Sequence, residues 1–493
     1  MLRGGPSQDL SVETAVSGVS MQAILRTLVR KYGCPGQMPI FAGALLVLGL
    51  YGNARAEEVP SYGIEQGVAL ADAQNSEIII ARKKLEAARG GLTEARSGYL
   101  PSAVASGFAD KRETQNSTAL RTEDYTASVR LLENVYTGGA VSNQVAIARL
   151  NVEKQECELD EVRNKVAMDV RISFYDVLLN RAKVGVRENS VRALSEELKS
   201  QEDRQRAGIV GTLNVQRAQV ALANEQPELA NAKTLLKNSH LHLVELVAWR
   251  SQASDPDFDV AGQLRYEARH PDLNECLGRA DTKRPEIRAR QIDVEIEDRQ
   301  YLVDQSALRP HVQAFSGYEV YNERDPFVGP EFNHGYVVGV SGTWHLFDGF
   351  ATKGRMQATR ARREAAAAAL EAARQAVASD VRSAFFDLQQ ADTVLEPVTK
   401  SVQSADESLE IAKSNLAAGL GTQLDILQAA ADVTKTRTTR LSAIYLHNVA
   451  VARLARACGS SPESLDFASN RLKQRHEKQA LDLAQPPAKL TQQ

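Results

Sequence analysis

The chain has 493 residues, of which 43% are hydrophobic and 25% are charged, an ordinary composition for a folded protein. Its formal net charge of −3 gives no support to a nucleic-acid partner. Length alone would suggest about three domains, but a duplication within the chain favours a single architecture made of two similar halves.

Residues 1–56 have the pattern of a cleaved export signal peptide. Arg26, Arg30 and Lys31 precede a short apolar core at 39–50. Ala54-Arg55-Ala56 has the A-x-A pattern of a signal-peptide cleavage site. The alternative is a transmembrane anchor, but an apolar core of about 12 residues is shorter than the roughly 20 that span a bilayer. Met21 is an alternative start of the chain.

The first half of the chain, residues 63–250, begins with a helical pattern at 63–99 that ends before Pro101. Two stretches of alternating polar and apolar residues follow, joined by the polar run 113–123. In the second stretch Tyr125, Ala127, Val129 and Leu131 share one face. Both stretches are therefore predicted to be strands whose two faces meet different environments.

A long helix is predicted next, over 140–206. Its apolar residues follow the three-four spacing of a coiled coil at Val145, Ala148, Val152, Leu159, Val162 and Val166. We expect Gly185 to break this helix, which would extend roughly 100 Å. The turn 207–212 leads into a return helix at 213–249, which Pro227 should bend. Two long helices joined by a short turn form an antiparallel hairpin.

Residues 251–270 are polar and read as a linker, and residues 271–460 repeat the plan of the first half. The second half is predicted to contain a helix at 274–308, strands at 311–322 and 336–347, a long helix from 352 that breaks at Pro397, a turn at 418–422, and a return helix that ends near 458. Residues 461–493 are predicted to be a disordered periplasmic tail.

The duplication is clearest where residues 378–388 nearly copy residues 167–177, with every matching pair 211 positions apart. Upstream of Pro101 the offset is 209. Asp169 and Arg171, with their counterparts Asp380 and Arg382, are spaced for opposite sides of a helix. We expect them to form ion pairs between helices or to lie on solvated faces. The stretch is interpreted as helix packing and not as a functional motif.

The predicted strands are near ten residues long, which suits a tilted membrane-spanning strand, and they carry aromatic residues near their ends. Four strands cannot close a barrel, and lipid does not tolerate open sheet edges. If the strands cross a membrane, several chains must share one barrel. Three chains would supply twelve strands, although the strand count does not fix that number. The alternative is a small soluble antiparallel sheet.

Four motifs, in order, resemble the TolC-like outer membrane efflux protein family: Arg284-Pro285-Glu286-Ile287, Leu346-Phe347-Asp348-Gly349, the run Gly421 to Leu427, and the run Val451 to Gly459. The resemblance covers nearly all of residues 63–460. It implies an α+β membrane protein in which each chain carries two copies of a strand-strand-long helical hairpin unit. The homotrimer would form a shared 12-stranded β-barrel in outer-membrane lipid and a periplasmic α-helical tunnel.

The resemblance also implies a function, that of an outer-membrane exit duct in a tripartite efflux or type I secretion system. Such ducts are joined through a periplasmic adaptor to an inner-membrane pump. The hairpin turns would contact the adaptor: Gly208, Ile209, Val210, Gly211 and Thr212 in the first half, and Gly419, Leu420, Gly421 and Thr422 in the second.

Asp425 would then be an acid at the tunnel entrance, and three copies around one axis would make a ring that favours cations. Some relatives carry a second acid one turn later, where this chain has Gln428, and the matching residue of the first half is Asn214. The alternative role for Asp425 is to cap its helix. The two roles are compatible.

Nothing in the sequence has the pattern of a catalytic triad, a phosphate loop or a metal site, so we expect no enzymatic activity and no cofactor. Cys157, Cys276 and Cys458 follow the leader, an odd number that excludes a fully paired set. Isolated thiols and a Cys276–Cys458 bridge both remain open. The rival function is a periplasmic coiled-coil adaptor, which predicts one hairpin with β-rich flanking domains. The cargo is not indicated.

Overall fold

The computed structural model describes residues 61–111, 123–249, 259–322 and 332–465. The predicted signal peptide, 1–56, lies outside the described residues. So do residues 251–258 of the predicted linker, the loops 112–122 and 323–331 that join the strands, and residues 466–493. No helix in the described ranges carries an apolar stretch long enough to cross a membrane.

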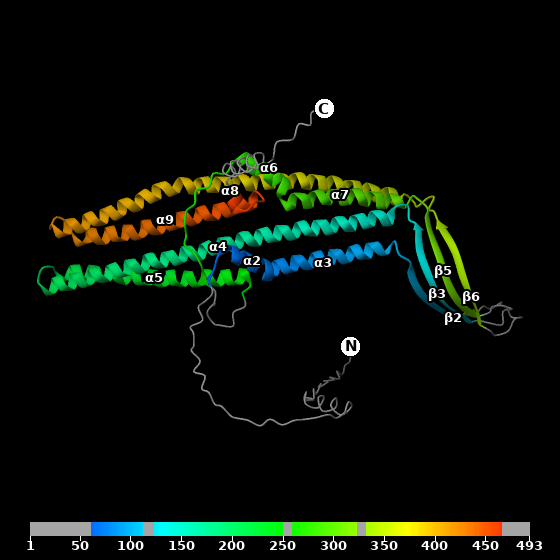
Figure 1. Ribbon diagram of the computed structural model, residues 1–493, viewed down its shortest axis with the longest axis horizontal. Helices are drawn as coiled ribbons and strands as arrows, with labels where there is room; N and C mark the ends of the chain where they lie inside the picture. The colour runs from blue at the N-terminus through cyan, green and yellow to red at the C-terminus, as the bar shows by residue number, and fades with distance from the viewer. Residues whose placement is uncertain (1–60, 112–122, 250–258, 323–331, 466–493) are drawn as a thin grey trace, which may run out of the picture. The chain divides into compact units, whose positions relative to one another are not determined.

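Four strands form an antiparallel sheet in the order β2-β3-β5-β6 (Figure 1). They are β2 (Ser102–Lys111), β3 (Glu123–Tyr136), β5 (His311–Asn322) and β6 (Phe332–Thr343). The pairing of β3 with β5 joins the two halves of the chain. The bounds predicted for β5 are confirmed, whereas the prediction of 336–347 for β6 was wrong by four residues at each end.

The end of β6 is set by its partner strand. Thr343 pairs with His311, the first residue of β5. Pro310 directly precedes His311. Because proline has no backbone N–H, the ladder cannot be extended past this pair. The alternation of large apolar residues continues to Leu346, but residues beyond Thr343 have no strand to pair with.

The sheet has one apolar face and one polar face. The register places Val129 opposite Tyr318 and Tyr318 opposite Tyr336 on the apolar face. On the other face the hydroxyls of Ser106 and Ser128 are hydrogen-bonded at 2.9 Å. There, too, Arg130 donates to Glu319 at 2.7 Å. Neighbouring residues of a strand point to opposite faces, so the predicted alternation is confirmed.

The helices that precede the strands are each divided in two. In the first half α2 (Ile64–Gln74) and α3 (Ser76–Ser97) replace the single helix predicted at 63–99. Asn75 has an extended backbone between them, and its side chain accepts from the Glu77 N–H at 2.8 Å and donates to the Leu246 carbonyl at 2.8 Å. Asn75 therefore caps α3 and fixes it to the end of the return helix.

The second half divides at the matching position. There α6 (Leu273–Lys283) and α7 (Pro285–Ser306) replace the single helix predicted at 274–308. Arg284 lies between them in an extended conformation. The α conformation is disfavoured for a residue before proline, and Pro285 is suited to the first position of a helix. The motif that begins with Arg284 therefore marks a helix start.

Two long hairpins follow the strands, as predicted. One joins α4 (Ala140–Arg206) to α5 (Thr212–Val247), and the other joins α8 (Ala351–Ala417) to α9 (Gln423–Ala457). The predicted breaks were wrong, because α4 continues through Gly185 and α8 continues through Pro397. A central glycine costs about 1 kcal/mol, which packing along a helix of 67 residues outweighs. Such a helix extends roughly 100 Å, so the turns lie far from the sheet.

The helices form rows that follow the order of the strands. Next to the sheet, contacts run from α3 to α4, then to α7 and to α8. Toward the turns, they run from α5 to α4, then to α9 and to α8. Both rows therefore end at α8 on one flank, just as the sheet ends at β6 on that flank and at β2 on the other (Figure 1).

The duplicated stretch lies in the core of the helical rows. Val170 and Val381 are fully buried at matching positions, and Phe174 packs so closely on Gly67 that an added Cβ there would lie 2.9 Å from the ring. Arg171 donates to Glu65 of α2 at 2.8 Å. Asp380 lies 3.7 Å from Arg284. Ion pairs between helices are thus confirmed for Arg171 and Asp380, which supports the interpretation of the stretch as packing.

A half-buried group of charges around the buried Arg284 links the two halves. Arg284 donates to both carboxylate oxygens of Glu286, at 2.6 and 2.7 Å, and Arg456 of α9 lies 4.0 Å from Glu286. Glu161 of α4 interacts electrostatically with Glu286, Arg456 and Arg284. Burial, followed by the negative charge of Glu286, raises the pKa of Glu161. Although burial opposes it, the Arg284 guanidinium holds the pKa of Glu286 below its usual value.

The described part of the linker is fixed to both halves. β4 (Asp259–Val260) pairs in parallel with β1 (Ser61–Tyr62), and Arg181 of α4 donates to the Val260 carbonyl at 2.7 Å. Farther on, the His447 ring of α9 lies 2.9 Å from the Glu267 carbonyl and 2.7 Å from Asp392.

The predicted tail begins in a 3-10 helix, Pro462–Leu465, whose last residue is buried.

Candidate functional site

The two hairpin turns have the same backbone design. Gly208, two residues after the end of α4, has φ +72°. The Gly208 N–H donates to the Gln205 carbonyl and the Ile209 N–H donates to the Arg204 carbonyl, both at 2.9 Å. Gly419, Leu420 and their partners repeat this pattern in the second turn. It is a Schellman motif, and only glycine adopts its left-handed position without strain.

Each turn presents apolar side chains to solvent at matching positions. Ile209 is 72% exposed and Leu420 is 83% exposed. Leu213 and Leu424, at the start of the return helices, are also exposed. Exposed apolar groups at the tip of a protein are typical of a contact with a partner. The sequence reasoning included Ile209 and Leu420 but missed Leu213 and Leu424, although their shared position in the two halves was visible.

Asp425 is present in the second turn only. The backbone N–H and the hydroxyl of Thr422 each donate to Asp425 Oδ2 at 2.8 Å, which forms a capping box at the start of α9. These bonds, the backbone one first, hold the pKa of Asp425 below its usual value. In the first turn the matching residues are Gly211 and Asn214, and α5 has no side-chain cap. The structure therefore shows the capping role, while the entrance role stays a prediction.

Asp425 also lines a groove of about 720 Å³ between α8 and α9. Three serines of α8, Ser401, Ser404 and Ser408, lie on one side of it. Gln428 and Asp432 follow Asp425 along α9 on the other side, with Gln428 Nε2 at 3.4 Å from Asp432 Oδ1. Gln428 is neutral, but Asp432 adds an acid two turns after Asp425. The seven-residue spacing was visible in the sequence and was missed.

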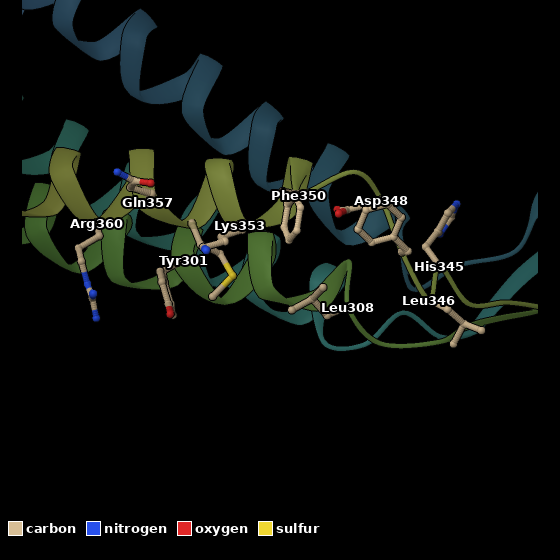
Figure 2. A pocket seen from close by; sticks show the side chains of 11 residues that line it. Tyr301, Leu308, His345, Leu346, Asp348, Phe350, Lys353, Gln357 and Arg360 are labelled. Atoms are coloured by element: carbon tan, nitrogen blue, oxygen red, sulfur yellow. The ribbon is translucent and has the colours of Figure 1, made fainter.

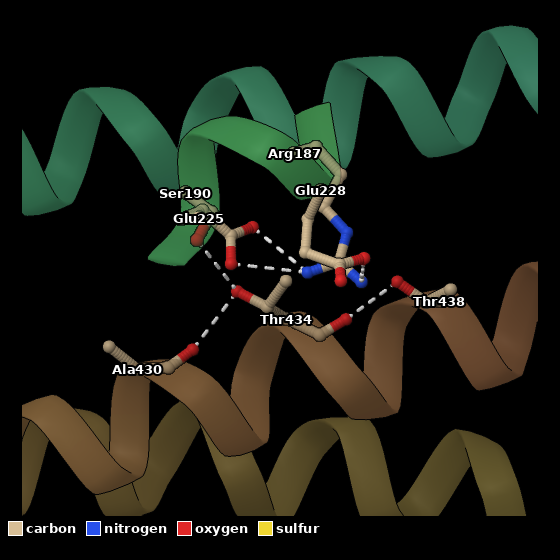
Figure 3. A network of polar contacts seen from close by, with 7 residues as sticks. All are labelled: Arg187, Ser190, Glu225, Glu228, Ala430, Thr434 and Thr438. Carbon is tan, nitrogen blue, oxygen red and sulfur yellow. Dashed lines mark hydrogen bonds and ion pairs between the residues drawn. The ribbon is translucent and has the colours of Figure 1, made fainter. Parts of the chain in front are cut away.

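Near the turns, polar side chains connect the two hairpins (Figure 3). Thr434 Oγ1 of α9 lies 3.2 Å from Ser190 Oγ of α4 and 3.0 Å from the carbonyl of Ala430. Beside it, Arg187 of α4 donates to both oxygens of Glu225 of α5 at 3.0 and 3.2 Å. The first hairpin is thus held by an ion pair, while a weaker contact between neutral hydroxyls joins it to the second hairpin.

A second cavity, of about 780 Å³, lies where β6 leads into α8 (Figure 2). Leu346, Phe347 and Phe350 expose apolar surface there, and Lys353 Nζ lies 5.8 Å from the centre of the Phe350 ring. Asp348 accepts from the Thr352 N–H at 2.7 Å, and hydrogen bonding to Thr352 lowers the pKa of Asp348. The motif 346–349 is therefore the start signal of α8.

Phe350 is strained. Its φ is +68°, a left-handed conformation that is rare for a bulky residue, and Gly139 takes the matching position in the first half with φ +94°. The side chain is 67% exposed and contacts only the edge of the Phe347 ring among aromatic groups in the described chain, with ring centres 5.5 Å apart. A strained and exposed aromatic residue indicates a role in contact with another surface.

Comparison with known proteins agrees with this architecture. The profile of the family described as "Outer membrane efflux protein" matches residues 68–248 and 276–460. A curated relative is the "Cobalt-zinc-cadmium resistance protein CzcC" of Cupriavidus metallidurans, 25% identical over 183 residues, which are 37% of this chain and 41% of CzcC. The aligned segment thus spans less than half of the curated relative.

Solved structures share the fold at low sequence identity. A structure of CusC has a TM-score of 0.68 at 16% identity, covering 86% of this chain and 99% of CusC. VceC of Vibrio cholerae has a TM-score of 0.66 at 17% identity, and the match covers 81% of this chain and 96% of VceC. The Campylobacter jejuni outer membrane channel CmeC has a TM-score of 0.66 at 15% identity, and the match covers 90% of this chain and 97% of CmeC.

Proposed function

Because the chain belongs to the outer membrane efflux protein family, we propose that it is a passive exit duct of the outer membrane in a tripartite efflux or type I secretion system. The observation that carries the proposal is the two-faced sheet with open edges, from which two helical hairpins extend. An apolar outer face suits lipid and a polar face suits a water-filled lumen. In this proposal a partner pump drives the transport.

The open edges support assembly with other copies. β2 and β6 each lack a second neighbour within the described sheet. A membrane strand must have all of its backbone groups paired, so β6 of one copy would pair with β2 of the next. Three copies would give the twelve-stranded barrel of a homotrimer. The helical rows would close in the same way, with α8 of one copy beside α3 and α5 of the next.

The cavity between β6 and α8 fits this arrangement. Because neighbouring strands run in opposite directions, β2 begins with Ser102 and β6 ends with Thr343 at the same end of the sheet. Closing the barrel would therefore bring the exposed Tyr99 and Leu100 of the next copy toward Phe347 and Phe350. Apolar surface that is exposed in one chain would be covered in the assembly.

The hairpin turns are the proposed site of the periplasmic adaptor, which would connect the duct to an inner-membrane pump. Ile209, Leu213, Leu420 and Leu424 provide the apolar surface for that contact. The rival proposal of an adaptor predicted one hairpin, whereas this chain has two hairpins and a membrane-type sheet. For cargo, divalent metal cations are the first class to test, because the curated relative is named for resistance to cobalt, zinc and cadmium.

Membrane fractionation and native mass spectrometry test the proposal together. The expected result is a trimer extracted from the outer-membrane fraction that conducts ions in planar bilayers. A monomer in the soluble periplasm would contradict it. For the cargo, a strain without this gene should become sensitive to Co²⁺, Zn²⁺ or Cd²⁺. Sensitivity to organic compounds alone would redirect the cargo assignment and leave the duct function in place.

A further inference from the structure

Cys276 and Cys458 meet in the core of the second half. Cys276 lies in α6, and Cys458 is the residue that ends α9. Both side chains are 0% exposed and belong to one apolar cluster that includes Val381 and Leu454. Each thiol is the largest influence on the pKa of the other, lowering that of Cys276 and raising that of Cys458. The two side chains thus share one buried cluster, although 182 positions separate them in the sequence.

The residues on either side of Cys458 contact the C-terminal end of α6, the helix that carries Cys276. Arg284, which follows α6, donates to the Ala457 carbonyl at 3.4 Å. An added Cβ at Gly459 would lie only 3.2 Å from Lys283 Cβ. The end of α9 therefore packs directly on the end of α6, and the closeness of the two thiols does not depend on a flexible loop.

We propose that Cys276 and Cys458 form a disulfide in the exported protein. The proposal rests on the periplasmic position of the helices, which follows from the proposed function. Exported proteins meet an oxidising compartment, where neighbouring thiols are oxidised and remain so. The bond would join the first helix of the second half to the last, and would enclose nearly all of that half in one covalent loop.

The oxidant is the disulfide of a periplasmic thiol–disulfide oxidoreductase. One cysteine thiolate attacks that disulfide and forms a mixed disulfide, and the other cysteine thiolate then displaces the oxidoreductase, which leaves as a dithiol. The two cysteines lose two protons and two electrons, and the oxidoreductase gains the electrons. Hydrogen bonding to Cys276, together with burial, raises the pKa of the Cys458 thiol. Oxidation is therefore fastest before α6 docks and buries the pair.

Cys157 is the internal control. It lies in α4 and is partly buried, and burial followed by the charge of Glu153 raises its pKa. Cys157 belongs to no apolar cluster of the described residues that contains another cysteine, so it should stay a thiol.

The test is peptide mapping of the full-length protein from the outer-membrane fraction, with cells quenched in acid and thiols alkylated under denaturing conditions without reductant. The expected result is a linked peptide pair containing Cys276 and Cys458, with Cys157 alkylated. In a strain that lacks the periplasmic disulfide oxidase, the linked pair should be largely lost. Alkylated Cys276 and Cys458 in protein from the wild-type outer membrane would overturn the disulfide and leave the duct function standing.

A stability comparison gives a second readout. Cys276→Ser should lower the thermal midpoint of the trimer, and reductant should lower the wild-type midpoint toward that of the variant. Cys157→Ser should leave the midpoint unchanged. If Cys276→Ser does not assemble, the peptide map of the wild-type protein still decides the question. A midpoint of Cys276→Ser equal to that of the wild type would contradict a stabilising role for the disulfide.

Discussion

Asp425 accepts two hydrogen bonds from Thr422, one from the backbone N–H and one from the hydroxyl, both at 2.8 Å. The same carboxylate lines the groove between α8 and α9. One residue thus caps a helix and also places a negative charge at the second hairpin turn, and the two effects can be separated by substitution.

Asp425→Asn should reduce the cation preference of the channel and leave its assembly intact, because asparagine keeps an oxygen that caps α9 but removes the charge. Planar-bilayer reversal potentials in a salt gradient measure the preference. Asn214→Asp is the matched control, since it adds an acid at the equivalent position of the first turn and should increase the preference. Unchanged selectivity in Asp425→Asn would leave capping as the whole role of this residue.

The cation preference should also depend on pH in a defined direction. The folded-state pKa of Asp425 is depressed. Its contribution to stability is therefore present above the unfolded-state pKa of about 3.9 and is lost as the pH falls through the folded-state value. The preference should likewise persist from neutral pH to about pH 4. A loss of preference between pH 7 and pH 5 would assign it to another group.

Leu420→Asp should abolish export and leave trimers intact, because it places a charge in the apolar surface of the turn. Export assays in cells and native mass spectrometry of the extracted protein measure the two effects. Ile411→Asp is the control, since it adds the same charge at another exposed apolar residue of the second hairpin, before the turn. A bulky insertion at Gly208 or Gly419 should act like Leu420→Asp. Loss of trimers in these variants would make the turns structural.

Thr434→Val should weaken the connection between the two hairpins. It removes the hydroxyl that lies 3.2 Å from Ser190 Oγ, at a cost of roughly 0.5–1.5 kcal/mol. The expected result is a higher mean conductance in planar bilayers, because the second hairpin is freer to move. Thr438→Val is the control, since the Thr438 hydroxyl donates to the Thr434 carbonyl within the same helix. Equal conductance in both variants would show that the Ser190 contact does not hold the turn.

Phe350→Gly should have opposite effects on the chain and on its assembly. Glycine relieves the left-handed strain, which is worth about 1–3 kcal/mol, but removes an exposed aromatic ring. We expect a smaller fraction of trimer on dilution in detergent, measured by native mass spectrometry. Phe347→Ala, which leaves the backbone conformation alone, should weaken the trimer in the same way. A trimer strengthened by Phe350→Gly would mean that the ring makes no contact between copies.

Glu161→Gln should stabilise the protein at neutral pH. The folded-state pKa of Glu161 is raised, so the stability linked to its protonated form is present below the unfolded-state pKa of about 4.3 and is lost as the pH rises through the folded-state value. Glutamine has nearly the same shape as glutamate and stays neutral at every pH. The thermal midpoint should rise at pH 7, and the gain should shrink toward pH 4.

Glu156→Gln is the control for this substitution. Glu156 forms an exposed ion pair with Arg89 at 3.4 Å, and such pairs contribute only about 0–1 kcal/mol. The thermal midpoint of the Glu156→Gln variant should differ little from that of the wild type at any pH. A lower midpoint in Glu161→Gln at pH 7 would show that the ionised carboxylate is the stabilising form.

Features that depend on local pattern could be predicted from the residues alone. The offset of 211 positions revealed two equivalent halves, and the three-four spacing around Val145, Leu159 and Val166 predicted a buried helical seam, which those three residues form. The glycines of the turns were likewise visible, because a left-handed C-cap selects glycine wherever it occurs. The bounds of β5 followed from alternation between Pro310 and the polar loop.

Where the local sequence pattern conflicts with contacts between distant segments, the bounds of an element follow from the packing of the folded chain. The alternation of β6 continues to Leu346, yet the strand ends at Thr343 because its partner begins at His311. Helix α4 passes through Gly185 because neighbouring helices pack along it, so a weak local preference is overruled. Asn75 divides its helix through a bond to Leu246, which lies 171 positions away.

The same distinction holds for the candidate site. Asp425 was found from its place after the turn, but its two bonds to Thr422 and its position in a groove with Asp432 required the fold. For Cys276 and Cys458 the sequence left isolated thiols and a bridge as open alternatives. The packing of α6 against the end of α9 makes them neighbours, because contacts between distant segments depend on how whole elements pack and not on local preference.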